Sequence, residues 1–441
     1  MGRNKTITFF EHQKKTFKEL EKEELSKNEV KKLIKLNDKL KIFEIGYSSV
    51  NAKQFVGALK IKNKTIQILP KIYNNEENKE KEALTNLLYM LSYTKKLKIR
   101  EDIANLTKNN DLFEIYIYLF AKNLLKEIEK GFYKDYNKKE ENLNFLKGKL
   151  NTTKQIKHNI INKHKLHCTY KEFSENNLIN QILKYTIELL KNITKSSKNK
   201  KLLDNLSFIF EDVEYKIITL NDFKKIHFNR MSERFKYYVE MAELFILNSS
   251  INLNSKDFHT FSLIFDMNTL FEEFIGNIVK NHKDEIFGNE NLNVHLQHTK
   301  HYLLRAAKIE DSQGTEDSFN FSVDKNNRGA FRLIPDIAVL KENEPYLIID
   351  TKYKKLDQTK PYSNISQSDI YQMFAYLKKY DCKKGILLYP KYNEEIKETF
   401  YIDNKTILHI VQIDLKYNMF TGRTHYINKI KKELSRLMDE I

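Results

Sequence analysis

The chain has 441 residues, too many for one typical hydrophobic core, so two or three domains are expected. Its 41% hydrophobic residues exclude general disorder, and its two cysteines exclude a disulfide framework. No apolar run approaches the roughly 18 residues that cross a bilayer, and the N-terminus lacks the apolar core of a signal peptide. These features predict a cytoplasmic protein with no membrane partner.

The charge balance favours a polyanion as a partner. The chain carries 76 Lys and Arg against 59 Asp and Glu, a formal net charge of +17. A basic surplus of this size suits nucleic acid. The competing explanation is compositional, because lysine is frequent throughout the chain, whereas arginine, which binds phosphate better, is scarce.

The first part of the chain combines short strands with longer helices. In chain order, the periodicity predicts a charged helical segment over 12–40, strands over 42–49, 55–61 and 65–73, and helices over 82–95, 111–131, 178–192 and 228–248, with exposed loops over 74–82 and 193–205. We treat residues 1–255 as an N-terminal region, strand-rich at about 42–72 and mainly helical afterwards.

Residues 256–441 follow a compact α/β alternation. The pattern predicts a helix over 267–282, strands over 293–304, 331–340 and 346–353, a helix over 366–380, strands over 385–390, 399–402 and 407–415, and a C-terminal helix. This order is typical of a mixed sheet with a helix on each side, so the fold class is α/β, or α+β over the whole chain.

Acidic residues and a lysine interrupt two apolar strands in the segment "RLIPDIAVLKENEPYLIIDTKYKKL". Asp350 and Lys352 alternate along one strand and therefore share a face, about 7 Å apart. Asp336 lies one short hairpin upstream, so the two carboxylates converge with the lysine nearby. Oxygen ligands of this kind hold Mg²⁺, which lowers the pKa of bound water and offsets charge on a phosphate. The alternative is a surface ion-pair cluster, but apolar neighbours predict burial, and buried carboxylates need a partner.

Neighbouring helices offer further site residues. Gln372 and Tyr376 lie on one stripe of the helix over 366–380, beside an apolar stripe, so they reach the site or form its polar flank. In the helix over 267–282, Glu272 and Glu273 lie on opposite flanks of the apolar face. Helical periodicity leaves open which of these two acids joins the site.

The pattern P-D…D-x-K followed by Q-x-x-x-Y resembles the PD-(D/E)xK nuclease superfamily. More narrowly, residues 50–390 resemble the McrC family, nuclease subunits of McrBC-type modification-dependent restriction systems. The matching stretches, in the family's order, are "FVGALKIKNKTIQILPKI", "LLYMLSY", "FEIYIYLFAKNLLKEIEKGFYKDY", "LNFLKGKLN", "NLINQILKYTIELL", "MNTLFEEF", "LIPDIAVL", "LIIDTKYK" and "SDIYQMFAYL". The nuclease end is also similar to that of LlaJI-type restriction subunits.

The resemblance implies a restriction-endonuclease-like fold for residues 256–441 and a role for each site residue. It assigns metal ligation to Asp336, Asp350 and Glu272 and makes Lys352 the catalytic lysine. Gln372 and Tyr376 match the polar helix stripe near the site. The implied cofactor is Mg²⁺, with Mn²⁺ as an alternative.

The resemblance also implies partners. McrC-like proteins work with an AAA+ GTPase of the McrB type in a hetero-oligomeric complex that acts on double-stranded DNA. Residues 1–255 would be the partner-interaction and DNA-contacting region. The one Gly-Lys step, Gly148-Lys149, lacks the first glycine of a P-loop, because Leu143 stands there, so we expect this chain to bind no nucleotide itself.

Two departures and two rival functions accompany this hypothesis. Lys147 stands where the family often has arginine, and residues 1–45 do not align with the family. The rivals are a non-cleaving adaptor of an AAA+ ring and a stand-alone repair nuclease.

A histidine-rich stretch with Cys168 has the wrong spacing for zinc and is expected to be a basic loop, solvated or facing DNA; its histidines are His158, His164 and His167.

Overall fold

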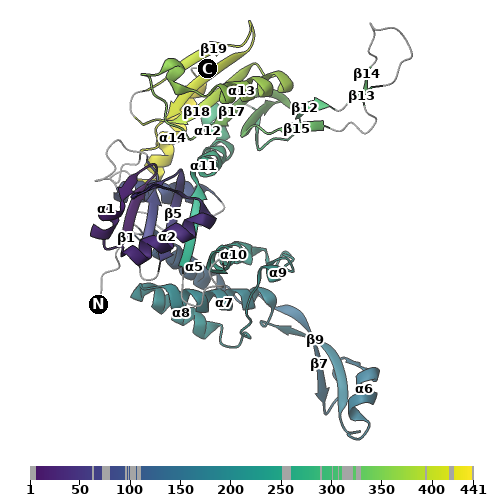
Figure 1. Ribbon diagram of the computed structural model, residues 1–441. Coiled ribbons are helices and arrows are strands. Elements are labelled where there is room, and N and C mark those ends of the chain that lie inside the picture. Colours follow the sequence, from purple (N-terminus) through teal and green to yellow (C-terminus); the bar gives the residue numbers. More distant parts are fainter. Residues whose placement is uncertain are drawn as a thin grey trace.

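The computed structural model describes residues 6–61, 64–71, 80–94, 97, 99, 106, 111–250, 260–288, 291–299, 301–305, 307–309, 321–323, 329–392, 395–416 and 422–439. Figure 1 shows a wide upper part holding the C-terminal sheet, an N-terminal sheet below it, a helical layer beneath that, and two slender projections.

The N-terminal part is an α/β unit built on two small sheets. Its elements are β1 (Thr6–Phe10), β2 (Lys14–Thr16), α1 (Phe17–Lys22), α2 (Lys27–Leu40), β3 (Phe43–Ile45), β4 (Ser49–Ala52), β5 (Phe55–Ile61) and β6 (Lys64–Leu69). One sheet has the order β1-β6-β5-β10, where β10 is Thr260–Asp266, and the other has the order β2-β4-β3. Gly57 permits the close approach of β10, because a Cβ there would lie 2.0 Å from the Leu263 carbonyl oxygen.

The single helical segment predicted over 12–40 is wrong. Residues 14–16 pair with β4 as a strand, and two separate helices follow. Thr16 and Ser26 each begin a helix with a capping box, which accounts for the interruption between α1 and α2. The apolar residues of both helices, including Leu20 and Leu33, pack on the N-terminal sheets.

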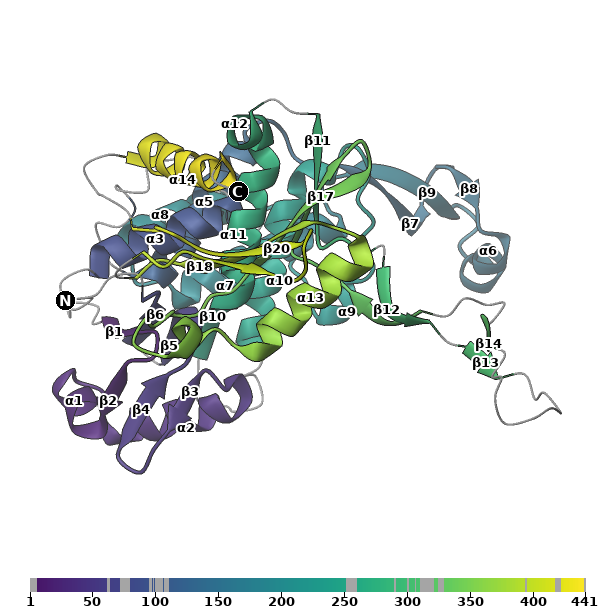
Figure 2. The ribbon, with the colours of Figure 1, turned by 90° about the horizontal axis from the view of Figure 1, so that it is seen from above.

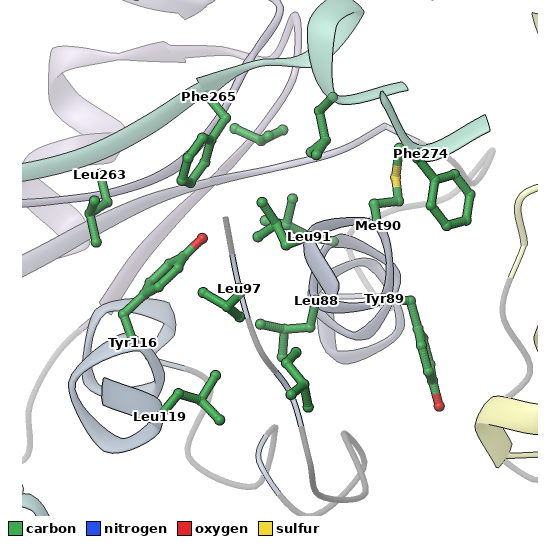
Figure 3. Close-up of a cluster of buried hydrophobic side chains, with 14 of the residues drawn as sticks. Leu88, Tyr89, Met90, Leu91, Leu97, Tyr116, Leu119, Leu263, Phe265 and Phe274 are labelled. Atoms are coloured by element: carbon green, nitrogen blue, oxygen red, sulfur yellow. The ribbon is translucent and has the colours of Figure 1, made fainter. Parts of the chain in front are cut away.

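A helical layer packs beneath the N-terminal sheet. It contains α3 (Glu80–Tyr93), α5 (Leu112–Ile128), α7 (Leu178–Ile193), α8 (Ser197–Ile209), α9 (Leu220–Phe223), the 3₁₀ helix η3 (Glu233–Phe235) and α10 (Lys236–Ser250). Side chains from α3, α5, β10 and the later helix α11 (Met267–Asn281) meet in one apolar core, as Figure 3 shows around Leu88, Tyr116, Phe265 and Phe274.

The exposed loop predicted over 193–205 is also wrong. The segment continues into α8, because the Ser196 side chain caps the helix and Leu203 and Leu206 are buried on its inner face. The helix predicted over 228–248 begins later, at residue 236, after η3. Of the loop predicted over 74–82, residues 74–79 lie outside the described part of the chain, and α3 begins at residue 80.

A narrow arm projects from the helical layer (Figure 1). It consists of β7 (Asp135–Leu143), β8 (Lys149–Leu150), α6 (Thr152–Asn159) and β9 (Leu166–Ser174), with β9 between the other two strands. Within the histidine-rich stretch, His158 lies at the end of α6 and His167 lies on β9, and their rings stack. Cys168 is buried, and the loop predicted for this stretch is confined to residues 160–165, where His164 is exposed. Gly148 has a φ of 71°, and a Cβ there would lie 2.6 Å from the Thr169 carbonyl oxygen, which explains this glycine structurally.

The C-terminal part is a six-stranded mixed sheet with the order β11-β16-β17-β18-β20-β19. Its strands are β11 (Leu292–Leu296), β16 (Ile337–Lys341), β17 (Glu344–Thr351), β18 (Lys384–Pro390), β19 (Glu398–Tyr401) and β20 (Ile407–Ile413). The helices are α11, α12 (Lys283–Phe287), the 3₁₀ helix η4 (Pro361–Asn364), α13 (Gln367–Tyr380) and α14 (Gly422–Asp439). Ile349 packs toward α11 and α14, whereas its neighbour Ile348 packs toward α13, so both faces are covered (Figure 2).

Two predicted strands are each divided in two. The segment over 293–304 splits into β11 and β12 (His301–Arg305), because Gln297 has a φ of 50° and ends the first strand. The segment over 331–340 splits into β15 (Gly329–Leu333) and β16, with Pro335 and Asp336 between them. β12 pairs with β15, and beyond them β13 (Ala307–Ile309) pairs with β14 (Phe321–Val323), forming the second projection.

The α/β class, with a mixed C-terminal sheet flanked by helices, is confirmed. The division at residue 255/256 stays a prediction; across it, β10 pairs antiparallel with β5 and so belongs to the N-terminal sheet. In the described part of the chain, no helix combines the length and apolar character needed to cross a membrane.

Candidate active site

Asp350 is a buried carboxylate that lacks the hydrogen bonds such a group needs. It lies near the end of the central strand β17, and its side chain is 1% exposed. The Lys352 ammonium lies 2.6 Å from Oδ2, but among the described residues no donor is hydrogen-bonded to Oδ1. A buried oxygen without a donor is unfavourable unless something outside the chain satisfies it.

Asp336 lies beside Asp350 through the pairing of β16 with β17. Its Oδ2 accepts hydrogen bonds from the backbone N–H and the hydroxyl of Thr351, each at 2.7 Å. Thr351 directly follows Asp350, so the two carboxylates are joined through one residue of the central strand. The turn of Pro335 and Asp336 at the start of β16 therefore aims the acid at the end of β17.

Both aspartates titrate far above their ordinary range. Burial, and then the charge of Glu272, raise the pKa of Asp336 to about 6. Burial, and then the charge of Asp336, raise the pKa of Asp350 to about 7. The two aspartates therefore hold less negative charge at neutral pH than two free aspartates, and a bound cation would offset the cost of ionising both.

Lys352 is held by groups from the strand and from α13. Its ammonium contacts Asp350 and donates a hydrogen bond to Gln372 Oε1 at 2.9 Å. Gln372 donates in turn to the Tyr376 hydroxyl at 2.6 Å, which donates to the Ile334 carbonyl at 2.9 Å. Burial alone would lower the pKa of Lys352, but the charge of Asp350 and its neighbours outweighs burial and raises it.

This chain of hydrogen bonds places Gln372 and Tyr376 against the acidic pair. Burial raises the pKa of Tyr376 to about 12, so its hydroxyl stays protonated and acts as a donor. The Ile334 carbonyl that it reaches lies two residues before Asp336. The polar stripe of α13 thus connects the lysine to the backbone that carries the first aspartate.

Glu272 faces the site from α11. Its side chain accepts a hydrogen bond from Gln297, whose backbone N–H donates to the Asp336 carbonyl oxygen at 3.0 Å. Burial raises the pKa of Glu272, the Gln297 hydrogen bond lowers it, and the charge of Asp350 raises it further. The charge of the adjacent Glu273 also acts on Glu272.

The fit of a metal to these residues is partial. Within the described ranges, no three His, Cys, Asp or Glu side chains are gathered closely enough to hold a metal ion. Asp336 and Asp350 nevertheless present two carboxylates, one with a buried oxygen free of donors. Mg²⁺ often binds through one or two carboxylates and keeps several waters, so a pair of this kind suits it.

Two further residues hold the site together and are not among those that the sequence predicts there. Thr351 holds Asp336 with two hydrogen bonds, and Gln297 joins Glu272 to the backbone of Asp336. The position of Thr351 between Asp350 and Lys352 is a sequence signal for its role. Gln297 offers no such signal, because the sequence pattern predicts a continuous strand over 293–304 around it.

Lys147, at the family's frequent arginine position, lies on the arm. Its ammonium stacks over the Tyr170 ring at 3.9 Å and lies 3.6 Å from Glu172. The residue that departs from the family pattern is therefore held by contacts within the arm.

Comparison with known proteins connects this geometry to a family. Residues 50–390 match the model of the McrBC 5-methylcytosine restriction system component family. The type IV methyl-directed restriction enzyme EcoKMcrBC of Escherichia coli K12 is 23% identical over 334 residues, covering 72% of this chain and 88% of that protein.

Solved structures show the same fold. A chain of a half-complex from a tetradecameric assembly of Thermococcus gammatolerans McrB AAA+ hexamers with bound McrC matches 98% of this chain and 100% of its own length, with a TM-score of 0.69 and 22% identity. A chain of the Thermococcus gammatolerans McrBC complex matches 62% of this chain and 87% of its own length, with a TM-score of 0.51 and 27% identity. Since the family model spans most of the sequence, this chain belongs to the McrBC 5-methylcytosine restriction system component family.

Proposed function

We propose that this chain is the Mg²⁺-dependent DNA endonuclease subunit of a GTPase-driven restriction complex. The observation that carries the proposal is the buried carboxylate of Asp350, whose Oδ1 has no donor in the described structure and which lies beside Asp336 and Lys352. Such a carboxylate is costly in a purely structural role. It is the arrangement that a cation and a phosphate would complete.

Asp336 and Asp350 would hold the metal, and Glu272 would join them if its contact with Gln297 opened. Bound Mg²⁺ supplies an activated water and offsets charge on the phosphate. Lys352 places a positive charge beside Asp350, where it stabilises negative charge developing on a phosphodiester. Gln372 fixes the direction of that ammonium, and Tyr376 fixes Gln372.

The substrate we propose is double-stranded DNA of foreign, modified origin. The family is a 5-methylcytosine restriction component, and the net charge of +17 favours a polyanion. Mn²⁺ would replace Mg²⁺ at carboxylate oxygens of this type. The compartment we propose is the cytoplasm, where a restriction system meets incoming DNA.

The partner we propose is an McrB-like AAA+ GTPase ring, whose hydrolysis this chain stimulates. One matched structure, which covers nearly the whole of this chain, is an assembly of McrB AAA+ hexamers with bound McrC, and the other is an McrBC complex. By that likeness, the chain works within a hetero-oligomeric complex, and residues 1–255 are the region that meets the ring and contacts DNA.

The test is cleavage of a methylated plasmid by this chain with its ring partner, Mg²⁺ and GTP. Asp350→Ala is expected to cut at least about 10³-fold more slowly than wild type, because the metal loses a ligand. Asp204→Ala, an exposed acid on α8, is the matched control and should cut normally. Wild-type rates from Asp350→Ala would overturn the site assignment.

A second candidate is a non-cleaving adaptor that regulates the ring. It is favoured by the lack of a ready three-ligand metal cage among the described residues. Partner GTP hydrolysis and plasmid cutting, measured separately, discriminate the two. An adaptor stimulates hydrolysis without cutting, and stimulation unchanged by Asp350→Ala is expected under both functions.

A further inference from the structure

The residue after the site lysine is tied to the opposite end of the sequence. Tyr353 follows Lys352, and its side chain is buried. Its hydroxyl donates a hydrogen bond of 2.8 Å to Glu11 Oε2, across 342 positions of sequence. Glu11 follows β1 of the N-terminal sheet and is 0% exposed. This contact therefore lies between the N-terminal sheet and the active-site strand.

Glu11 is itself firmly held. The same Oε2 accepts a hydrogen bond of 3.0 Å from the backbone N–H of Lys71, just beyond β6. The backbone N–H of Glu11 donates to the Leu69 carbonyl oxygen at 3.0 Å. The carboxylate is thus fixed to two paired strands, and it presents a rigid acceptor to Tyr353.

Tyr353 touches both sides of the site. Its ring lies 5.6 Å from that of Phe271, centroid to centroid, and Phe271 directly precedes Glu272 on α11. On the chain, Tyr353 is joined to Lys352, whose backbone N–H donates to the Leu388 carbonyl oxygen at 2.9 Å. Tyr353 therefore contacts the helix that carries Glu272 and directly follows the lysine of the site.

We infer that Glu11 and Tyr353 are positioning residues, through which the N-terminal sheet holds Lys352 and Glu272 in register with the two aspartates. The inference rests on the proposed function and deepens it, because the region proposed to meet the ring is then in hydrogen-bonded contact with the cleavage site. Displacements of about 1 Å in a reacting group are enough to reduce rates strongly, so a contact that fixes the position of Tyr353 bears on the rate of cleavage.

The test is a double-mutant cycle in the full complex with its ring partner, saturating Mg²⁺ and methylated plasmid. Tyr353→Phe keeps the ring on Phe271 and removes the hydroxyl; we expect kcat to fall about tenfold with KM unchanged. Glu11→Ala should lose at least as much, because it also leaves the Lys71 backbone N–H without its acceptor. The double variant should cut no more slowly than Glu11→Ala, because the Tyr353 hydroxyl then has no Glu11 contact left to lose. Glu11→Gln, which keeps an oxygen acceptor, should recover most of the rate.

The cycle is necessary because the Tyr353 hydroxyl also interacts with Tyr392. Tyr238→Phe is the matched control, since Tyr238 is equally buried and its hydroxyl donates to the Asn123 carbonyl at 3.0 Å in the helical layer. It should lose similar stability and keep its cleavage rate. If Tyr353→Phe cuts as fast as Tyr238→Phe, the inference is overturned; additive losses in the double variant also overturn it.

A second readout separates this inference from the proposed function. Acetylation of Lys352 by an amine-reactive reagent, measured against Lys354 in the same peptide, reports how firmly the ammonium is held. We expect Tyr353→Phe to raise the relative reactivity of Lys352 by about 3- to 10-fold and Tyr238→Phe to leave it unchanged. If wild type cuts no DNA, the proposed function fails, and unchanged Lys352 reactivity in Tyr353→Phe would then reject the positioning role on its own.

Discussion

Two acidic pairs in this molecule, one buried and one with a buried and a half-buried member, differ in how their oxygens are satisfied. Asp111 and Glu114 lie between the N-terminal sheet and the helical layer, whereas Asp350 lies on β17 of the C-terminal sheet and the half-buried Asp336 directly precedes β16. Burial raises the pKa of Asp111 as it does that of Asp350. Depth of burial and the direction of the pKa shift therefore do not distinguish a structural acid from a candidate ligand.

Hydrogen bonding does distinguish them. Asp111 caps α5 and also accepts from Thr65 at 3.1 Å. Glu114 accepts from the Thr194 hydroxyl at 2.6 Å, the Lys195 backbone at 2.9 Å and the Asn199 amide at 2.8 Å. Asp350 has the Lys352 ammonium at one oxygen and no described donor at the other. A buried acid with satisfied oxygens holds the fold together, and one with an open oxygen is available to bind.

The largest effect that this comparison predicts is on folding. Glu114→Ala should lower the free energy of unfolding by about 3–5 kcal/mol, because it leaves several buried donors without an acceptor. The measurement is urea unfolding followed by circular dichroism. Glu240→Ala, an exposed acid on α10, should change stability little. If Glu114→Ala were as stable as Glu240→Ala, the hydrogen bonds of the buried Glu114 carboxylate would not stabilise the fold.

The next effect distinguishes the two adjacent acids of α11. Glu272→Gln should slow plasmid cleavage by the full complex about 10- to 100-fold, or ~1.4–2.7 kcal/mol, because a potential ligand loses its charge while its contact with Gln297 is kept. Glu273→Gln is the matched control and should cut within about threefold of wild type. Equal losses from both variants would mean that their charge, rather than the position of Glu272, matters.

The sequence predicted the C-terminal sheet and its polar residues well, for a physical reason. Buried strands such as β17 are continuous apolar runs, so Asp350 stands out within the strand and Lys352 directly after its end. The helix periodicity likewise placed Gln372 and Tyr376 on one stripe, and both take part in the hydrogen-bond chain that ends on Lys352. A local sequence pattern indicates a functional residue where a polar or charged side chain interrupts an otherwise apolar segment.

The remaining features depend on contacts between distant segments. Residues 197–209 look polar and lysine-rich, and they form a helix because Leu203 and Leu206 meet the core. Gln297 gains its role from a left-handed turn that no local signal indicated. The hydrogen bond between Glu11 and Tyr353 joins positions at opposite ends of the chain, and neither residue is unusual in its own segment. Such pairs emerge only from the tertiary structure.

The smallest predicted effect is a gain in stability when the charge of Asp350 is removed. Removing a structural acid is expected to lower stability instead. Asp350 has a pKa of about 7 in the folded protein, against about 3.9 for an unfolded chain. The folded state thus binds the proton more tightly, so the ionised carboxylate destabilises it increasingly as pH rises from about 4 to 7 and fully above that range.

In a buffer with EDTA, Asp350→Asn should therefore raise the unfolding free energy at pH 8 by about 1–2 kcal/mol and change it little at pH 4. Asp111→Ala should lose about 1–2 kcal/mol at pH 8 instead, because its acceptor oxygens are in use. Thermal melts at the two pH values measure both variants, and excess Mg²⁺ should raise the melting temperature of wild type but not of Asp350→Asn. A loss of stability at pH 8 in Asp350→Asn would place Asp350 with the structural acids and remove the contrast between the two pairs.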